Sequence, residues 1–212
     1  MKRKFSWTYG AKSYSVEADL SESPYYRKCQ KDRSIEYLPY YSTIDDPVMK
    51  DIADRISEQV PEYADDAYVA NVVLAMIGGN VKYAYDEDVY GLKDLWGLPV
   101  VVLENGRGDC DCMTDLYVSI AHNLDLDVVS VLVEGHMFAA AHVDWAGVYY
   151  LLGGKKYYHV EATSDLPVAG RYWDESRVQA WAAPDTPPQQ FVSTLTECPS
   201  GGSRGLLGKP MS

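Results

Sequence analysis

The amino-acid sequence predicts an α+β fold in which helices come first and an antiparallel sheet follows. Apolar residues recur every three or four positions in segments between residues 47 and 124, which indicates amphipathic helices. Between residues 128 and 161 the period changes to two, as in strands that bury one face. Helices followed by strands with short turns are typical of α+β domains. With 212 residues, of which 47% are apolar, the chain can bury a substantial core.

The N-terminal half is expected to contain a hairpin and two helices. Aromatic and apolar residues alternate with polar ones on both sides of a turn at Gly10. An Asp-Pro pair begins the first helix at Pro47, Pro61 stops it, and a pair of glycines ends the second. The expected elements are a hairpin at 5–20, helices at 47–60 and 65–77, and loop-rich segments at 21–45 and 80–105.

The C-terminal half is expected to contain a third helix and then the sheet. The helix begins near Cys110 and ends at Asn123, and its apolar residues recur at helical spacing. A Gly153-Gly154 turn joins two of the strands that follow into a hairpin. The expected strands cover residues 128–133, 136–143, 148–152 and 156–161, with a further strand near 171–173.

Composition argues against two classes of partner. A net charge of −12 disfavours nucleic acid, because contacts to a phosphate backbone need clustered Lys and Arg. The same charge disfavours anionic membrane surfaces, and no run approaches the ~18 apolar residues of a membrane-spanning helix. The N-terminus is positively charged but lacks the apolar segment of a signal peptide. We therefore expect a cytoplasmic protein without nucleic-acid partners or membrane insertion.

The four cysteines show no Cys-x-x-Cys pairs, so a structural zinc site is not expected, nor is any other metal or cofactor. A Cys29–Cys198 disulfide is compatible with an oxidising compartment but is not required by the sequence. Buried cysteines usually serve as small core residues, and we expect this of Cys29, Cys112 and Cys198.

Cys110 differs from the other three because it follows Gly-Arg-Gly-Asp at the expected first turn of a helix. Unpaired N–H groups at a helix start stabilise a thiolate and can hold a developing oxyanion. The neighbouring Asp109 and Asp111 act in the opposite direction, since nearby negative charge raises the pKa of a thiol. The helix start alone is therefore insufficient, and a histidine must lie close to the sulfur.

His136 is the expected base, because it opens a strand directly after a glycine, where a site can form. His142 is the second candidate, since it lies six positions later on the same face of the strand. The other two, His122 and His159, are expected to be solvated or locally hydrogen-bonded. Most histidines behave in this way, and His142 would do so if His136 is the base.

Glu161 is the expected orienting acid. It ends the strand that follows the Gly153-Gly154 turn, which could bring it beside the strand of His136. A carboxylate there would fix the imidazole tautomer and stabilise its cation. Asp144 and Asp165 are weaker alternatives for this role.

Three segments together resemble the transglutaminase-like superfamily of cysteine hydrolases and acyltransferases. The resemblance covers roughly residues 65–165 and is carried by the Gly-Asp-Cys-Asp-Cys helix start, the Gly-His-Met-Phe strand and the His-Val-Glu-Ala-Thr strand. It implies a papain-like core in which the cysteine helix packs against an antiparallel sheet. Cys110 would be the nucleophile, His136 the general base and acid, and Glu161 the orienting acid. Glu161 departs from the family, which most often has Asp there, and Cys112 departs from its usual acidic or polar residue.

The lead-in to the cysteine helix also fits the family, through Val-Lys-Tyr-Ala-Tyr-Asp and Trp-Gly-Leu-Pro. Within these segments Tyr83 and Trp96 are candidates for substrate binding and for the second oxyanion donor. The whole domain would span residues 1–183, with the hairpin and first helices in 1–105 and the catalytic core in 106–183. A C-terminal extension at 184–212 would be either wrapped around the domain or disordered.

The expected function is that of a cysteine-dependent hydrolase or acyltransferase that acts on an amide or isopeptide bond of a peptide or protein substrate. A thioester intermediate and a peptidase-like outcome are favoured. The first alternative is a catalytically inactive domain of the same fold that binds peptides. A further alternative is a metal ion held by Cys110, Cys112 and His136.

Overall fold

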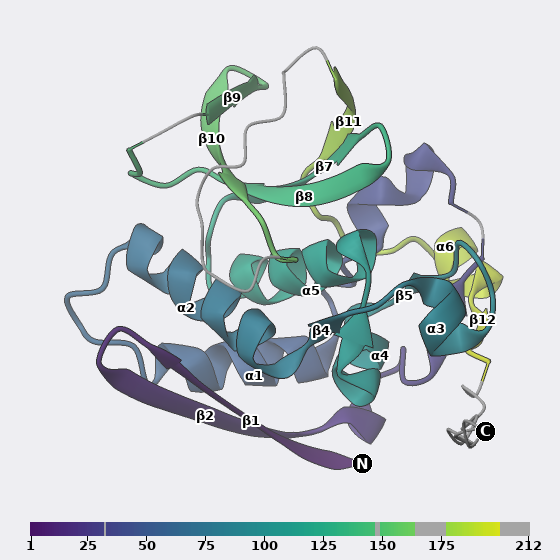
Figure 1. Cartoon of the computed structure of the whole chain (residues 1–212), viewed down its shortest axis with the longest axis horizontal. Helices are drawn as coiled ribbons and strands as arrows, with labels where there is room; N and C mark the ends of the chain where they lie inside the picture. Colours follow the sequence, from purple (N-terminus) through teal and green to yellow (C-terminus); the bar gives the residue numbers. More distant parts are fainter. Residues whose placement is uncertain (32, 147–148, 164–176, 200–212) are drawn as a thin grey trace, which may run out of the picture.

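The computed structural model describes residues 1–31, 33–146, 149–163 and 177–199. It has a mixed α+β architecture with antiparallel sheets, the largest of which is strongly curved (Figure 1). Helix α5 lies between this sheet on one side and helices α1, α2 and α4 on the other (Figure 1). The expected strand near 171–173 and the alternative acid Asp165 lie outside the described residues.

The N-terminal hairpin and the first helix form as the sequence predicted. Strands β1 (Lys2–Tyr9) and β2 (Lys12–Asp19) pair in antiparallel register and bury alternate side chains against α1 and α2. Helix α1 (Pro47–Ser57) begins after Asp46, whose side chain accepts a hydrogen bond from the N–H of Val48 at 2.9 Å.

Helix α2 (Asp66–Asn80) extends past the glycine pair that was expected to end it. Gly79 is needed for close packing rather than for termination, because a Cβ there would lie 3.2 Å from Cβ of Trp7 in the hairpin. The helix ends at Asn80, whose side-chain amide donates to the carbonyl oxygen of Met76 at 2.8 Å. The prediction of an end at Ile77 was therefore wrong.

Residues 80–105 contain more regular structure than the sequence indicated. Helix α4 escaped prediction because Val100, Val101, Val102 and Leu103 are four consecutive buried apolar residues, which show no amphipathic period. The elements of this region are β4 (Lys82–Tyr83), α3 (Asp86–Tyr90), β5 (Trp96–Gly97), α4 (Pro99–Asn105) and β6 (Arg107–Gly108). The preceding segment holds short 3₁₀ helices η1 (Leu20–Glu22) and η2 (Ile35–Tyr40) around β3 (Lys28–Gln30).

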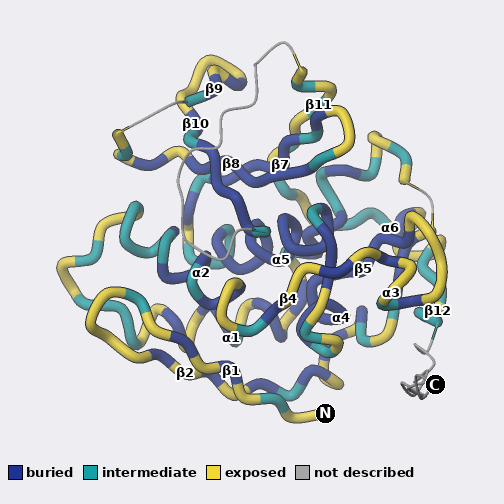
Figure 2. Tube along the Cα trace, viewed as in Figure 1, coloured by how far each residue is buried: buried dark blue, intermediate teal, exposed yellow. Residues whose placement is uncertain are grey.

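Helix α5 (Cys110–His122) is the centre of the core, as Figure 2 shows by its burial. Every residue from Asp111 to Ala121 is buried, so the helix is enclosed on all sides rather than on the single face that its apolar spacing predicted. Its carboxylate at Asp115 is satisfied there by three donors: the Trp96 indole at 2.6 Å, and the Ser42 and Ser130 hydroxyls at 3.2 Å.

The sheet has the order β11-β7-β8-β10-β9, and its neighbouring strands are antiparallel. Its two faces pack against different groups. Met137 and Ala139 of β8 face the core around α5, whereas Phe138 belongs to a smaller cluster with Tyr150 and Tyr157. The strands are β7 (Val128–Val133), β8 (His136–Ala141), β9 (Tyr149–Leu152), β10 (Lys155–Val160) and β11 (Val178–Ala182).

The chain after β11 returns to the β3 side of the molecule. Helix α6 (Gln189–Thr194) buries Phe191 against Tyr41, and β12 (Thr196–Glu197) pairs with β3. Cys198 then forms a disulfide with Cys29, across a Cα–Cα distance of 5.1 Å. The disulfide that the sequence left open is thus present, and Cys29 is also a buried core residue, as expected. The domain boundary at 183 stays a prediction.

None of the described helices combines the length and apolar character that crossing a bilayer requires. A disulfide is typical of oxidising compartments, whereas the sequence led us to expect a cytoplasmic protein. These two indications point in opposite directions, so the compartment stays a prediction.

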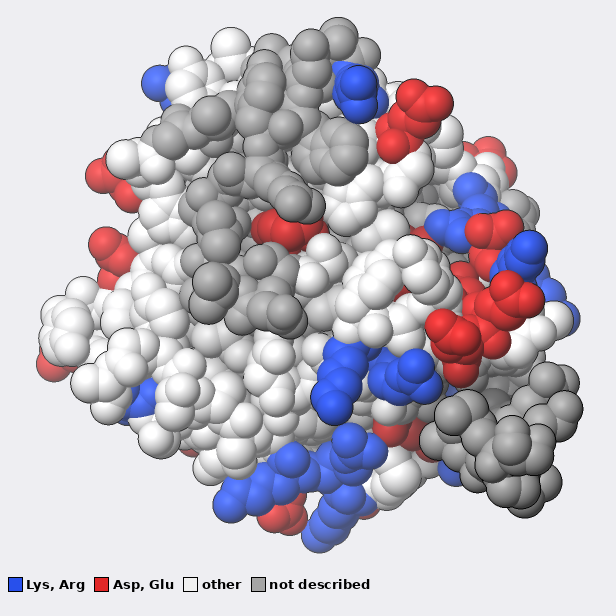
Figure 3. Space-filling view, in the orientation of Figure 1, with Lys and Arg blue, Asp and Glu red and all other residues white. Residues whose placement is uncertain are grey.

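Charge is unevenly distributed over the surface despite the net value of −12. Figure 3 shows Lys and Arg side chains gathered over the N-terminal hairpin and the neighbouring strands β4 and β6. Lys82 of β4 is opposite Arg107 of β6 in the register of these strands, and both side chains are exposed. The absence of a nucleic-acid partner was inferred from the negative net charge, but this face of the protein is positively charged. It therefore stays a prediction.

Candidate active site

The Gly-Arg-Gly-Asp-Cys segment owes its composition to the turn from α4 into α5. Gly106 ends α4 with a φ of 63°, a left-handed conformation that favours glycine. Gly108 must also lack a side chain, because a Cβ there would lie 2.9 Å from Cβ of Cys112. Asp109 is the N-cap of α5, and its side chain accepts a hydrogen bond from the N–H of Cys112. These local requirements leave Cys110 as the first residue of the helix, as the sequence predicted.

The half-buried Cys110 sulfur lies between the start of α5 and strand β8. The backbone N–H groups of Met137 and Asp111 lie close enough to the sulfur to lower its pKa. Thr114 makes a second link between helix and strand, because its hydroxyl donates to the carbonyl oxygen of Met137 at 3.2 Å. The sulfur thus contacts β8 at the residue that directly follows His136.

The surroundings of Cys110 favour the protonated thiol. Burial, together with the charges of Asp111 and Asp109, raises the pKa of the Cys110 thiol to about 12. The hydrogen bonds from Met137 and Asp111 lower this pKa but do not outweigh burial. A cation must therefore approach the sulfur before a thiolate can form near neutral pH.

His136 and Glu161 are brought together, although 25 positions separate them in the sequence. Nε2 of His136 lies 2.9 Å from the Glu161 carboxylate. His136 is placed by the tight turn between β7 and β8, where Gly135 has a φ of 73°. Glu161 directly follows β10, which pairs with β8.

The Glu161 carboxylate is held by several donors. The Thr163 hydroxyl donates to it at 2.6 Å and the Thr163 N–H at 3.2 Å. Burial alone would raise the pKa of Glu161, but the hydrogen bonds of His136, His159 and Thr163 outweigh it and hold this pKa well below its usual range. Glu161 is therefore a carboxylate at neutral pH and can accept a hydrogen bond from Nε2 of His136.

His159 is the site residue that the sequence interpretation missed. It was expected to be solvated or locally hydrogen-bonded, yet it is only 1% exposed and stacks on Phe138 with ring centroids 4.2 Å apart. Its Nε2 lies 3.5 Å from the same Glu161 carboxylate that binds His136. The alternation of β10 puts His159 on the face of Glu161, and this was the signal that could have identified it.

The alternatives to His136 and Glu161 lie elsewhere. His142 follows the end of β8, is exposed, and its Nδ1 lies 2.8 Å from the carbonyl oxygen of Lys156. Asp144 is exposed, and among the described residues no hydrogen bond or ion pair joins it to His136 or His159. The described part of the chain therefore favours His136 as the partner of the acid.

Tyr83 and Trp96 differ in their suitability for contact with substrate. Tyr83 is 45% exposed in β4, opposite Gly108 of β6, and lies close enough to Cys110 for that thiol to help raise the pKa of the phenol, after burial. Trp96 is 3% exposed, stacks on Tyr41 at 3.8 Å and serves the core. A role in substrate binding is thus compatible with the position of Tyr83, and the position of Trp96 does not support one.

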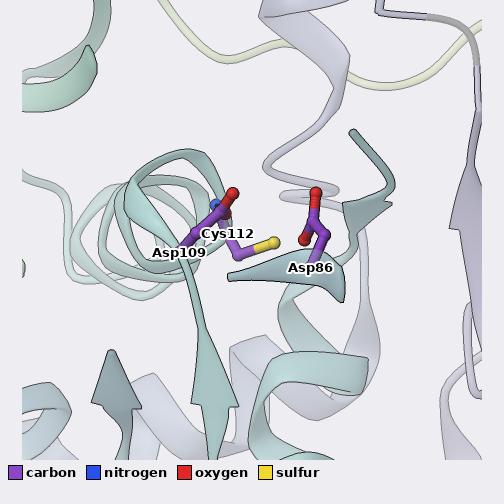
Figure 4. Close-up of side chains that lie close together, drawn as sticks. All are labelled: Asp86, Asp109 and Cys112. Atoms are coloured by element: carbon purple, nitrogen blue, oxygen red, sulfur yellow. Dashed lines mark hydrogen bonds between the residues drawn. The ribbon is translucent and has the colours of Figure 1, made fainter. Parts of the chain in front are cut away.

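A group of possible metal ligands lies on the other side of the α5 start. One ligand atom each of Asp86, Asp109 and Cys112 lies within 4.8 Å of the others (Figure 4). Burial raises the pKa of Asp86 to about 7, and the charge of Asp109 adds to this effect. The group differs from the metal alternative drawn from the sequence, which combined Cys110, Cys112 and His136.

Comparisons with known proteins add little to this geometry. No protein-family model and no curated protein matches the chain. Among solved structures, a candidate protease from Parabacteroides distasonis is similar to this chain with a TM-score of 0.35 and 14% sequence identity. The similarity covers 57% of this chain and 27% of that protein, so the chain spans about a quarter of its length.

Proposed function

We propose that this protein is a cysteine-dependent hydrolase or acyltransferase with a transglutaminase-like, papain-like core. Cys110 is the nucleophile, His136 the general base and acid, and Glu161 the orienting acid. The observation that carries this proposal is the 2.9 Å contact between Nε2 of His136 and Glu161. Met137, the residue after His136 in β8, has its backbone N–H close to the Cys110 sulfur. A thiol at a helix start and an imidazole oriented by a carboxylate are the parts of an acyl-transfer site.

In the proposed mechanism Nε2 of His136 stays paired with Glu161, and Nδ1 exchanges the proton with the sulfur. In the first step the Cys110 thiol gives its proton to Nδ1 and the thiolate attacks the carbonyl carbon of an amide. Backbone N–H groups at the start of α5 stabilise the oxyanion that forms. The C–N bond then breaks as His136 returns the proton to the leaving amine, which yields a thioester on Cys110.

The second step regenerates the thiol. His136 takes a proton from water or from an acceptor amine, whose oxygen or nitrogen attacks the thioester carbonyl. The C–S bond breaks and the proton passes to the sulfur. We favour water as acceptor and therefore a peptidase, with the peptide lying across the exposed ring of Tyr83.

A peptide-binding domain without catalysis is the second candidate, and the raised pKa of the Cys110 thiol favours it. The two functions differ in the reactivity of this sulfur. An enzyme keeps Cys110 reactive near neutral pH through the His136–Glu161 pair. A binding domain has a thiol that reacts only at alkaline pH.

The test is trapping with a peptide that carries a thiol-reactive electrophile, followed by intact mass and mapping of the modified residue. We expect one adduct, on Cys110, formed at neutral pH in the native protein and absent from C110A. C112A is the matched control, since it removes a thiol two positions away and should retain the adduct. Labelling that persists in C110A, or that needs alkaline pH in the native protein, would contradict the enzymatic proposal.

A further inference from the structure

Asp86, Asp109 and Cys112 form a buried anionic cluster at the side of α5 that faces α3 and β5. Figure 4 shows the carboxylates of Asp86 and Asp109 on either side of the Cys112 sulfur. Each residue comes from a different part of the local structure: the first turn of α3, the N-cap of α5 and the first turn of α5. We propose that these three side chains bind a divalent transition-metal ion such as Zn²⁺.

The Asp86 side chain is the first observation that points to a ligand. It is 4% exposed, and one of its oxygens accepts a hydrogen bond from the N–H of Leu95 at 2.7 Å. The other oxygen, Oδ1, is buried and has no hydrogen-bond partner among the described residues. A buried carboxylate oxygen without a donor is costly, and a metal ion would satisfy it.

The balance of charge is the second observation. Two cations lie in this region: Arg33 pairs with Asp111 and, at 3.1 Å, with Asp94, and the exposed Lys93 lines the same cavity as Asp86 and Asp109. No ion pair within the described ranges reaches Asp86 or Asp109. Two carboxylates and a thiol therefore share a buried volume without a direct counter-ion. A divalent cation would supply the missing positive charge.

The spacing of the ligand atoms suits a small ion after modest movement. They lie within 4.8 Å of one another, whereas ligands of one tetrahedral zinc ion are roughly 3.5 Å apart, given bonds of about 2.0–2.3 Å. Each side chain would need to move inward by about an ångström or less. Rotation of a carboxylate or a thiol side chain can provide this.

The site is accessible from solvent on one side and closed on the other. Asp86 and Asp109 line a cavity of about 210 Å³ together with Tyr85, Glu87, Lys93 and Asp94, which offers an entry path and room for a water ligand. On the closed side a Cβ on Gly97 would collide with the Tyr90 hydroxyl and lie 3.3 Å from the Cys112 sulfur. The glycine thus leaves space for the thiol.

The donor set selects the class of metal. A thiolate is a ligand that Zn²⁺, Co²⁺ and similar ions accept, whereas Ca²⁺ and Mg²⁺ prefer oxygen ligands only. The Cys112 sulfur is fully buried and accepts a hydrogen bond from the N–H of Gly97 at 3.3 Å. Burial and the charges of Asp111 and Asp109 raise the pKa of this thiol, so a bound ion would have to displace its proton. The bound ion would tie α3 and β5 to the start of the Cys110 helix.

The experiment measures metal binding to the full chain after removal of metal with a chelator. We expect one equivalent of Zn²⁺ to bind, and Co²⁺ to give the ultraviolet charge-transfer band of a cobalt–thiolate bond. C112S and D86N should weaken Zn²⁺ binding tenfold or more, and C112S should abolish the cobalt band. The matched controls are C110S, which removes the neighbouring thiol, and E87Q, which removes the neighbouring exposed carboxylate; both should bind as the native protein does.

Several outcomes would overturn the site. These are the lack of stoichiometric Zn²⁺ binding, loss of the cobalt band in C110S rather than C112S, and equal Zn²⁺ affinity in D86N and E87Q. Tighter binding of Ca²⁺ without a sulfur band would also do so. If C112S does not fold, X-ray absorption of the zinc-loaded native protein decides the question. It should show one sulfur at about 2.3 Å and otherwise oxygen ligands, and a spectrum without sulfur would refute the proposal.

Discussion

Nε2 of His136 lies 2.9 Å from the carboxylate of Glu161 and joins the first residue of β8 to the residue that follows β10. Glu161 can reach because the backbone N–H and the hydroxyl of Thr163 fix its other oxygen. The Glu161 side chain is thus held at both oxygens. It is longer than the Asp that is usual at this position in the family that the sequence resembles. The contact with His136 fixes the position of the imidazole relative to Glu161.

Replacement of Glu161 by Gln should slow acylation of Cys110 by about 10²–10⁴-fold at neutral pH, because the imidazolium loses its counter-ion and its fixed tautomer. The measurement is the rate of Cys110 alkylation as a function of pH. Glu134→Gln is the matched control, since Glu134 is an exposed residue of the turn before His136. Equal rates in both variants would remove Glu161 from the site.

Replacement of His159 by Phe should separate its electrostatic role from its packing role. The aromatic ring keeps the stack on Phe138, so the fold should persist, but the contact at 3.5 Å with Glu161 is lost. The pKa of Glu161 should rise, and Cys110 alkylation should slow by less than tenfold because His136 keeps its own bond. His159→Ala should instead leave a cavity and cost about 2–4 kcal/mol of unfolding free energy. If His159→Phe lowered the alkylation rate as strongly as Glu161→Gln does, His159 would be required for the activation of Cys110, which would contradict this prediction.

Asp115 should make stability depend on pH in an unusual direction. Burial raises the pKa of Asp115 to about 7, although the donors Trp96, Ser130 and Ser42 lower it in part. A carboxyl group whose pKa is higher in the folded than in the unfolded state binds more protons when folded. Its contribution to stability is therefore complete below about pH 4 and is lost as the pH rises toward 7.

Asp115→Asn should remove this loss, which amounts to a few kcal/mol at most. The measurement is urea unfolding of the native protein and the variant between pH 4 and 8. The difference between their unfolding free energies should change across this range. Asp54→Asn, which replaces an exposed carboxylate, is the control. The difference between the unfolding free energies of this variant and the native protein should stay constant. A constant difference for Asp115→Asn would contradict the raised pKa.

Reduction of the Cys29–Cys198 bridge should lower the melting temperature. The bridge spans 169 positions, and a loop of that length corresponds to about 5 kcal/mol in the chain-entropy account of disulfides, which is an upper value. Melting with and without reductant measures the effect. A C29S/C198S double variant should melt at the lower temperature and should not respond to reductant. A native protein that does not respond either, and that has four titratable thiols, would lack the bridge.

The sequence predicted those parts of the fold that depend on local patterns. The hairpin, α1, the start of α5 and strands β7 to β10 follow from alternation, caps and turns. The sequence did not predict the features that depend on contacts between distant segments. Gly79 accommodates the Trp7 side chain rather than ending α2, and α4 buries five consecutive residues, Pro99–Leu103. Such demands come from neighbours that are distant in the chain.

The candidate site shows the same division. Cys110, His136 and Glu161 could be proposed from their positions at the ends of elements, and Tyr83 from its place before the helix. His159 was missed although alternation along β10 places it on the face of Glu161, and only the fold shows that its ring lies against Phe138 and close to the Glu161 carboxylate. Asp86 likewise gains meaning only when α3 packs beside the Cys112 sulfur.

The covalent link between Cys29 and Cys198 also decides how the molecule responds to mechanical force. A pull on the two termini travels through the bridge and bypasses every residue between these cysteines, including α5 and the curved sheet. Such a pull loads only the residues before Cys29 and those after Cys198. Force applied between the two ends would therefore leave α5 and the sheet unloaded until a thiol opens the bridge.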